Sequence, residues 1–278
     1  MPTFDTPEPI SVTLEFDLGS ARITASKRTD TVVEVRPSDA TADADVRAAQ
    51  QTKITCSGGK LVVKGPKKRS LFGKCGSLDV TIELPAGSDV LGTSPMADFT
   101  CAGRLGECRF KTSLGDLQMD EAEAVNLRTD YGDIRLARVT GDAELIASGL
   151  IEAGEIAGAA LVKNGNGATT IGEVTGALRA TASNGLISVG VAHAGVEAKS
   201  ANGAIRIGEV ARGRVVLRAA AGDLEVGIRQ STAAWLDVAT GLGNVRNSLG
   251  PSDGPGDAAE TVEVRAHTSL GDIVIRRS

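Results

Sequence analysis

A glycine that recurs at short, nearly regular intervals limits what this chain can fold into. The first six intervals are 17, 17, 18, 18, 18 and 19 residues, and the last two are 21 and 28. Repeats this short cannot hold a four-stranded propeller blade or a helical hairpin repeat. They are also too short for a β-α-β unit, whose crossover alone takes about 10–12 residues. The anchor glycines are Gly115, Gly132, Gly149, Gly167, Gly185, Gly203, Gly222, Gly243 and Gly271.

Apolar and polar residues alternate after each anchor glycine. The second and fourth positions are apolar in eight of nine repeats, and the position between them is polar in eight of nine. This period of two predicts a strand with one buried face. The intervening polar positions are Gln118, Arg135, Glu152, Thr170, Ser188, Arg206, Glu225 and Arg246. A second short alternating stretch follows in most repeats, so each repeat predicts two strands and two tight corners.

These observations predict an all-β, single-domain β-solenoid with about 17–18 residues per coil. Successive coils would stack at roughly 4.8 Å, the distance between paired strands. Such a thin core has little room for rings, in agreement with aromatic residues making up only 3% of the chain. The glycines, 34 in all, would supply corner conformations that other residues avoid.

The repeat weakens toward the N-terminus. Ala97 takes the place of an anchor glycine there, and residues 99, 101, 108 and 110 are expected to point inward. Residues 1–90 are predicted to form a β-rich part that caps the solenoid, with one short helix at Asp43–Gln51, and residues 91–278 the solenoid itself. Solenoid ends need such covers because bare strand edges polymerise. Expected strands in the cap are Ser11–Phe16, Ala21–Ala25, Thr31–Arg36, Leu61–Lys64 and Leu78–Leu84.

The C-terminal end is expected to be protected differently. The last alternating stretch, Ile273–Ile275, runs into Arg276, Arg277 and Ser278. Two arginines at the end of the chain would discourage pairing with another strand edge. Two loops interrupt the repeats, a basic one at 64–76 and an acidic one at 250–257, and both are expected at the surface.

No constellation of catalytic, cofactor-binding or metal-binding residues stands out, so none is predicted. His193 and His267 lie in different repeats without a nucleophile at a suggestive spacing. Six residues separate Cys101 from Cys108, and no histidine pair lies nearby, which favours buried structural thiols over a zinc site. Cys75 lies in the basic loop, where neighbouring cations could lower a thiol pKa, but it has no base partner.

The corners themselves contain recurring polar residues. Asp116, Asp133, Asp223 and Asp272 follow their anchor glycines, and Asn precedes the anchor in three successive repeats, at 166, 184 and 202. Calcium-binding β-rolls also repeat Gly-x-Asp, but with a nine-residue period. We therefore predict that the aspartates are turn residues suited to these corners, and that the asparagines form a corner ladder, with ligand binding as the lesser alternative.

Charge and targeting signals narrow the partners. The net charge of −5 lacks the basic excess typical of nucleic-acid binding. No apolar run is long enough for a membrane span, and the first residues do not resemble a secretory signal. These features, with only four cysteines, predict a cytoplasmic protein. The cluster within 64–74, including Lys67, Lys68, Arg69 and Lys74, could meet an anionic partner.

Several stretches resemble the bacterial "putative adhesin" β-strand-repeat family, a domain without an assigned activity. They are Val80–Gly87 and the Ser/Thr-x-Gly-Asp-Ile/Leu units within 112–116, 128–134 and 268–273. Residues 30–37 and 71–74 are similar to actinobacterial members. The resemblance implies a β-solenoid and no catalytic residue.

We therefore expect a non-enzymatic scaffold or protein-interaction module, present as a monomer or small homo-oligomer. A self-assembling filament protein similar to bactofilins is the alternative. A β-helical enzyme acting on polysaccharides is a remote third reading, since an active site needs a concave pocket with converging polar groups.

Overall fold

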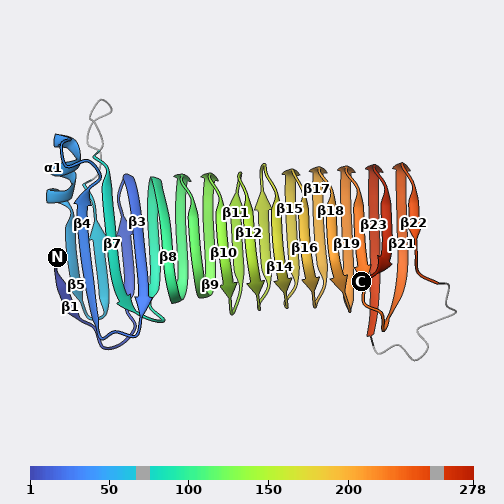
Figure 1. Ribbon diagram of the computed structural model, residues 1–278, viewed down its shortest axis with the longest axis horizontal. Coiled ribbons are helices and arrows are strands. Elements are labelled where there is room, and N and C mark those ends of the chain that lie inside the picture. Colours follow the sequence, from blue (N-terminus) through green and yellow to red (C-terminus); the bar gives the residue numbers. More distant parts are fainter. Residues whose placement is uncertain (67–75, 251–259) are drawn as a thin grey trace. The chain divides into compact units, whose positions relative to one another are not determined.

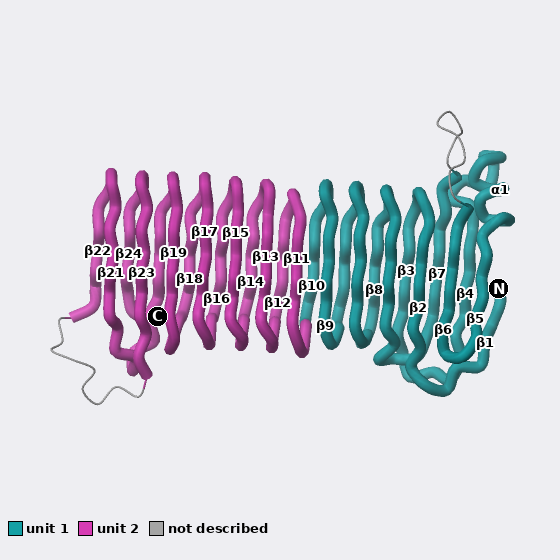
Figure 2. Tube along the Cα trace, turned by 180° about the vertical axis from the view of Figure 1, so that it is seen from behind, with its two compact units in different colours: residues 1–138 teal, residues 139–278 magenta. Residues whose placement is uncertain are grey.

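The computed structural model describes residues 1–66, 76–250 and 260–278. Strands make up most of these residues, and a single short helix is described among them (Figure 1). Their parallel pairing from coil to coil confirms the all-β solenoid class predicted from the repeats. The chain divides into two compact units, residues 1–138 and 139–278 (Figure 2).

Unit 1 contains two sheet faces that share the long strand β8. On one face β8 pairs with β2, and β2 with β6; on the other β8 pairs with β3, and β3 with β7. All four pairings are parallel. The elements are β1 (Thr3–Asp5), β2 (Ser11–Glu15), β3 (Leu18–Ser26), β4 (Asp30–Pro37), α1 (Asp43–Gln51), β5 (Lys53–Ser57), β6 (Lys60–Lys64), β7 (Leu78–Pro85), β8 (Asp89–Leu114) and β9 (Leu117–Tyr131).

The outermost strands of unit 1 leave the parallel pattern. β5 pairs antiparallel with β6, β4 antiparallel with β7, and β1 antiparallel with β4. The helix α1 has the bounds expected from the sequence, and the five expected strands coincide with β2, β3, β4, β6 and β7 to within a few residues. The sequence did not indicate β1 or β5. The expected boundary near residue 90 stays a prediction.

The inward assignment of the weak repeat in unit 1 is confirmed. Phe99, Cys101, Cys108 and Phe110 are each at most 2% exposed. The Phe99 ring centroid lies 4.9 Å from that of Phe110 and 6.0 Å from that of Phe16. Three of the chain's five phenylalanines therefore pack together in one cluster of the core.

Unit 2 is a stack of short parallel strands. The boundary between the units falls within β10 (Ile134–Val139). The following strands are β11 (Ala143–Ala147), β12 (Ile151–Ile156), β13 (Ala160–Asn164), β14 (Thr169–Val174), β15 (Leu178–Asn184), β16 (Ile187–Ala192), β17 (Val196–Asn202), β18 (Ile205–Val210), β19 (Gly213–Ala221), β20 (Leu224–Ile228), β21 (Thr232–Leu242), β22 (Val245–Asn247), β23 (Glu260–Leu270) and β24 (Ile273–Arg277).

Equivalent residues of successive repeats stack directly upon one another in this unit. The second position after the anchor glycine forms one continuous ladder, with Thr169 paired to Ile187, Ile187 to Ile205, and Ile205 to Leu224. Every member of that ladder is at most 1% exposed. The alternating pattern therefore predicted both the strand and its buried face correctly.

The last two coils of unit 2 do not stack in sequence order. β19 pairs with β23, and β23 pairs in turn with β21. On the other face β20 pairs with β24, and β24 with β22. The final segment of the chain thus lies between two coils that precede it in sequence, and β21 and β22 form the outermost coil (Figures 1 and 2).

This order corrects the expectation that the two arginines protect the end of the solenoid. Arg276 donates from Nε to Glu225 at 2.8 Å, and Arg277 donates from Nη1 to the carbonyls of Arg229 and Thr232, both at 2.8 Å. Both arginine side chains therefore form hydrogen bonds within the stack of coils and do not lie at its outer end. The expectation fails because the last strand in the sequence is not the last strand in space.

Candidate protein-interaction surface

Most corners at the anchor glycines are tight because the glycine lies against a carbonyl of a neighbouring coil. Gly132 has φ +154°, and a Cβ added there would lie 2.0 Å from the Gly115 carbonyl oxygen. The buried Thr129 hydroxyl donates to the same carbonyl at 2.8 Å. Backbone and side chain together hold the corner in one conformation.

Aspartate side chains at the corners accept hydrogen bonds from backbone amides of the neighbouring coil. The backbone N–H of Asp116 donates to Oδ1 of Asp98, and the backbone N–H of Asp133 donates to Oδ1 of Asp116, both at 2.8 Å. The amide of Asp272 donates to Oδ1 of Asp223 at the same distance. The sequence indicated aspartates suited to corners, and the structure adds that they join successive coils.

The residue just before the anchor position points outward and is apolar in three repeats of unit 1. Met96 is 45% exposed, Leu114 47% and Tyr131 71%. Tyr131 is the only tyrosine in the chain. Leu114 is the register partner of Tyr131, and Met96 that of the half-buried Leu18. We call Met96, Leu114 and Tyr131 the apolar corner ridge.

Polar residues border the ridge on both sides. Asp98, Asp116 and Asp133 follow it across the corner, and Lys111 and Arg128, which are register partners, precede it. Arg128 forms an ion pair with Asp130 at 3.4 Å. An apolar centre with a rim of both charge signs is the usual anatomy of a protein–protein interface.

The same corner position is polar in the middle of unit 2. The side-chain amide of Asn184 donates from Nδ2 to Oδ1 of Asn166 at 2.8 Å, and that of Asn202 donates from Nδ2 to Oδ1 of Asn184 at 3.1 Å. The asparagine ladder predicted from the three Asn-Gly pairs is therefore present. The side chains of this ladder bind one another, and the ladder presents a more hydrophilic surface than the apolar corner ridge does.

The histidines are each bound to a carboxylate. His193 Nε2 lies 2.7 Å from Glu173 Oε1, and His267 Nε2 lies 3.2 Å from Asp237 Oδ1. Both pairs join neighbouring coils at the surface. The sequence indicated imidazoles in polar or corner positions without a catalytic partner, and it did not indicate these carboxylate contacts.

The two buried thiols are poor nucleophiles. Burial raises the pKa of Cys101 well above its ordinary value, with a further contribution from nearby Cys108. Burial, and then the charge of Asp89, raise the pKa of Cys108 to about 12. Both side chains remain protonated at neutral pH, in agreement with the structural thiols expected from the sequence. Cys75 and the basic cluster at 67–69 and 74 lie outside the described residues.

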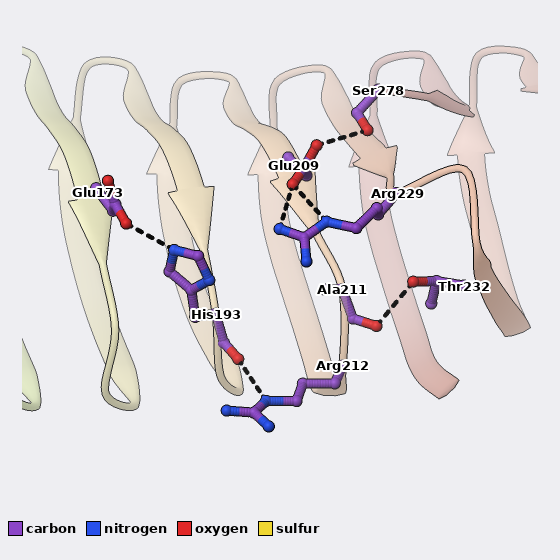
Figure 3. A network of polar contacts seen from close by, with 8 residues as sticks. All are labelled: Glu173, His193, Glu209, Ala211, Arg212, Arg229, Thr232 and Ser278. Carbon is purple, nitrogen blue, oxygen red and sulfur yellow. Dashed lines mark hydrogen bonds and ion pairs between the residues drawn. The ribbon is translucent and has the colours of Figure 1, made fainter. Parts of the chain in front are cut away.

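A network of polar contacts connects Ser278, the last residue, to the ends of strands β18 and β20 (Figure 3). Arg229 donates from Nε and Nη2 to Glu209 Oε1 at 2.7 and 2.5 Å. The Ser278 hydroxyl donates to the other oxygen of Glu209 at 2.9 Å. Hydrogen bonds from Arg229 and Ser278 hold the pKa of Glu209 below its ordinary value. We call Glu209, Arg229 and Ser278 the polar clamp.

Two negative findings concern the described ranges 1–66, 76–250 and 260–278. They contain no group of three or more His, Cys, Asp or Glu side chains arranged to hold a metal ion. They also contain no helix with the length and apolar character to cross a membrane.

The apolar corner ridge was not predicted from the sequence, because the alternating pattern concerns only the positions that follow each anchor glycine. The signal was available one position before it. Met, Leu and Tyr stand there in unit 1, where a polar residue would be expected at an exposed corner.

Solved structures similar to the chain share little sequence with it. A putative adhesin from Parabacteroides merdae is 9% identical, with a TM-score of 0.43, over 98% of this chain and 94% of that one. A putative adhesin from Bacteroides fragilis is 9% identical, with a TM-score of 0.36, over 99% and 95%. A "putative lipid binding protein" from Parabacteroides distasonis is 10% identical, with a TM-score of 0.28, over 98% and 95%.

No curated protein matches the chain. A family model does, and it covers residues 13–276, which include nearly all of the described strands of both units. The coil register, the corner glycines and the Gly-Asp units all lie within that range. The chain belongs to the Toastrack DUF4097 family.

Proposed function

We propose that this chain is a non-enzymatic scaffold that binds a protein partner through the apolar corner ridge. The proposal rests on one observation: Met96, Leu114 and Tyr131, at equivalent corner positions, are 45%, 47% and 71% exposed. Isolated exposed apolar residues are normal on protein surfaces. A contiguous apolar patch with a polar rim is typical of an interaction site.

The rigidity of the corners supports binding. Each ridge residue precedes an anchor position whose backbone is closely packed against the neighbouring coil, as at Gly115 and Gly132. The main chain therefore loses little freedom when a partner binds, which lowers the entropic cost of association. Tyrosine and methionine are also enriched at interfaces relative to the rest of the surface.

The partner expected from this surface is a folded protein or an extended segment with its own apolar row. Coils repeat at roughly 4.8 Å, so the three ridge residues span about 10 Å. The mixed charges of Asp116, Asp133, Lys111 and Arg128 favour a partner whose rim also carries both signs.

The chemistry of the site residues supports a non-enzymatic role. His193 and His267 are each bound to a carboxylate between coils, and burial keeps the Cys101 and Cys108 thiols protonated. Cys56, Cys101 and Cys108 are free thiols, which suits the cytoplasmic location that we include in the proposal. Cell fractionation tests the location.

A site-specific cross-linking experiment tests the ridge. A photo-reactive residue replaces Tyr131 in one variant and Asn184, the equivalent corner residue of the asparagine ladder, in another. We expect a discrete cross-linked partner from position 131 and none from position 184. The same cross-link from both positions, or from neither, contradicts the proposal.

Affinity for the captured partner supplies the second measurement. Leu114→Ser together with Tyr131→Ser should weaken binding at least about tenfold, because aromatic and apolar anchors contribute most of the energy at such interfaces. Asn184→Ser is the matched control and should bind as the unchanged protein does. Melting temperatures of both variants should stay close to that of the unchanged protein, since all three side chains are exposed. Equal affinity of the ridge variant and the control would contradict the proposal.

A further inference from the structure

The outermost coil of unit 2 ends in an open strand edge. β21 pairs with β23 on one side, and no strand of the described chain pairs with its other side. β22 pairs with β24 in the same one-sided way. Unpaired N–H and C=O groups along such an edge are a template for another strand.

The core of this coil is also incompletely covered. Leu236 and Val238 are half-buried, whereas their register partners Val264 and Ala266 have no exposed surface. On the other face Val245 is 43% exposed, and its partner Ile273 is fully buried. The apolar ladder of the solenoid therefore continues to its last coil and is uncovered there.

The β21 part of this edge has few of the features by which proteins usually prevent edge pairing, whereas β22 is short and contains Arg246. β21 has eleven residues, TAAWLDVATGL, with a single charge at Asp237 and neither lysine nor proline. Short edges, inward charges and prolines are the common protections. Unit 1 shows the contrast, because its last strands, β1 and β5, have only three and five residues and pair antiparallel.

We infer that the β21–β22 end binds the same end of a second copy of this chain, giving a closed two-fold dimer. A molecule that binds this end must supply a strand edge and an apolar ladder that match those of β21 and β22. The same end of another copy supplies both, and no other described edge of the chain combines them. A two-fold contact uses the same patch on both copies and so closes at two.

The size of the coil end fits a stable contact. Eleven strand residues at about 3.3 Å span about 36 Å, and the two faces of a coil lie about 10 Å apart. The outline between the two faces is therefore about 360 Å² per copy, and side chains that point outward from both faces widen the covered area to about 600 Å². The total of about 1,200 Å² is at the lower limit of specific, stable interfaces.

Two substitutions test this contact by mass measurement. Val238→Lys places an ammonium in the ladder where it can still reach water in a single copy but would be enclosed in the dimer. Ala239→Lys places a charge on the neighbouring exposed position, where the fold itself is not disturbed. Thr181→Lys, on an exposed position of the interior strand β15, is the control with the same change in charge.

Sedimentation equilibrium over a concentration series gives the readout. We expect a monomer–dimer equilibrium for the unchanged protein and for Thr181→Lys. Val238→Lys should raise the dissociation constant about a hundredfold or more, since an unpaired charge is expensive to enclose, and Ala239→Lys should raise it by a smaller factor. Melting curves establish that each variant is folded.

Three outcomes would overturn the inference. The first is a monomer at every concentration. The second is a dimer that both lysine variants leave intact, because the contact would then lie elsewhere. The third is growth into species larger than a dimer, which is the filament reading and requires a contact that does not close. None of these outcomes depends on the apolar corner ridge.

Discussion

Single inward positions decide whether a coil forms. Ile205 belongs to a ladder in which Ile187 and Leu224 lie directly above and below it, and all three are at most 1% exposed. A side chain at this position therefore has no contact with water in the folded coil. The cost of a substitution there is therefore set by burial rather than by local strand preference.

Replacing Ile205 by aspartate should prevent folding or make the protein insoluble. The carboxylate would be buried without a partner, a change that costs several kcal/mol out of a typical total stability of about 5–15 kcal/mol. Circular dichroism and soluble yield measure the effect. Arg206→Asp, on the adjacent exposed position, is the control and should fold. A soluble Ile205→Asp variant with an unchanged melting temperature would show that residue 205 does not face the core.

At the scale of strands and corners, polar contacts join coils that are distant in sequence. The polar clamp connects Glu209, just before the end of β18, to Arg229 after β20 and to Ser278 at the end of the chain. Arg277 binds the carbonyls of Arg229 and Thr232 next to it. These contacts hold the C-terminal segment at the place where it enters the stack.

The clamp predicts a pH-dependent part of the stability. Folding lowers the pKa of Glu209, so the folded state gains stability when this carboxyl is ionised. That gain is complete above the unfolded pKa, near 4.5, and is lost as the pH falls through the folded value. The stability difference between the unchanged protein and Arg229→Met should accordingly be larger at pH 7 than at pH 3. Urea unfolding at both pH values measures it.

Arg212 supplies the control for this experiment. Its Nε donates to the backbone carbonyl of His193 at 3.0 Å rather than to a carboxylate (Figure 3). The effect of Arg212→Met should therefore not change between pH 7 and pH 3. An equal pH dependence of the two variants would show that the Arg229–Glu209 contact is not its source.

Sequence reasoning succeeded for elements whose signal is local. The alternation after each anchor glycine predicted the strands and their buried face, and the composition of 43–51 predicted α1 with its bounds. The order of the last two coils could not be predicted in this way. Leu217, Ala266 and Val238 are equivalent ladder residues, so the pattern fits stacking in sequence order as well as the order found.

The candidate interaction surfaces were missed for a related reason. Periodicity identifies residues that face the core, and Met96, Leu114 and Tyr131 lie outside that register at the corners. The exposure of Val238 and Val245 depends on which coil is last, and that follows from the order of stacking rather than from any local motif.

At the scale of the whole molecule, the proposed dimer couples association to folding. Whatever binds only the folded state stabilises it by mass action, and the stabilisation by a second copy rises with the logarithm of its concentration. A two-fold contact through the β21–β22 end therefore makes the apparent stability of the protein depend on how concentrated it is.

The melting temperature of the unchanged protein should rise with protein concentration. Differential scanning calorimetry from a few micromolar to a few hundred micromolar measures the trend, and Thr181→Lys should follow it. Val238→Lys should melt at the same temperature throughout, because it remains a single copy. A rise shared by all three proteins would place the association outside the coil end. A melting temperature that is constant for all three would mean that the open edge remains unpaired in solution, despite the length and the single charge of β21.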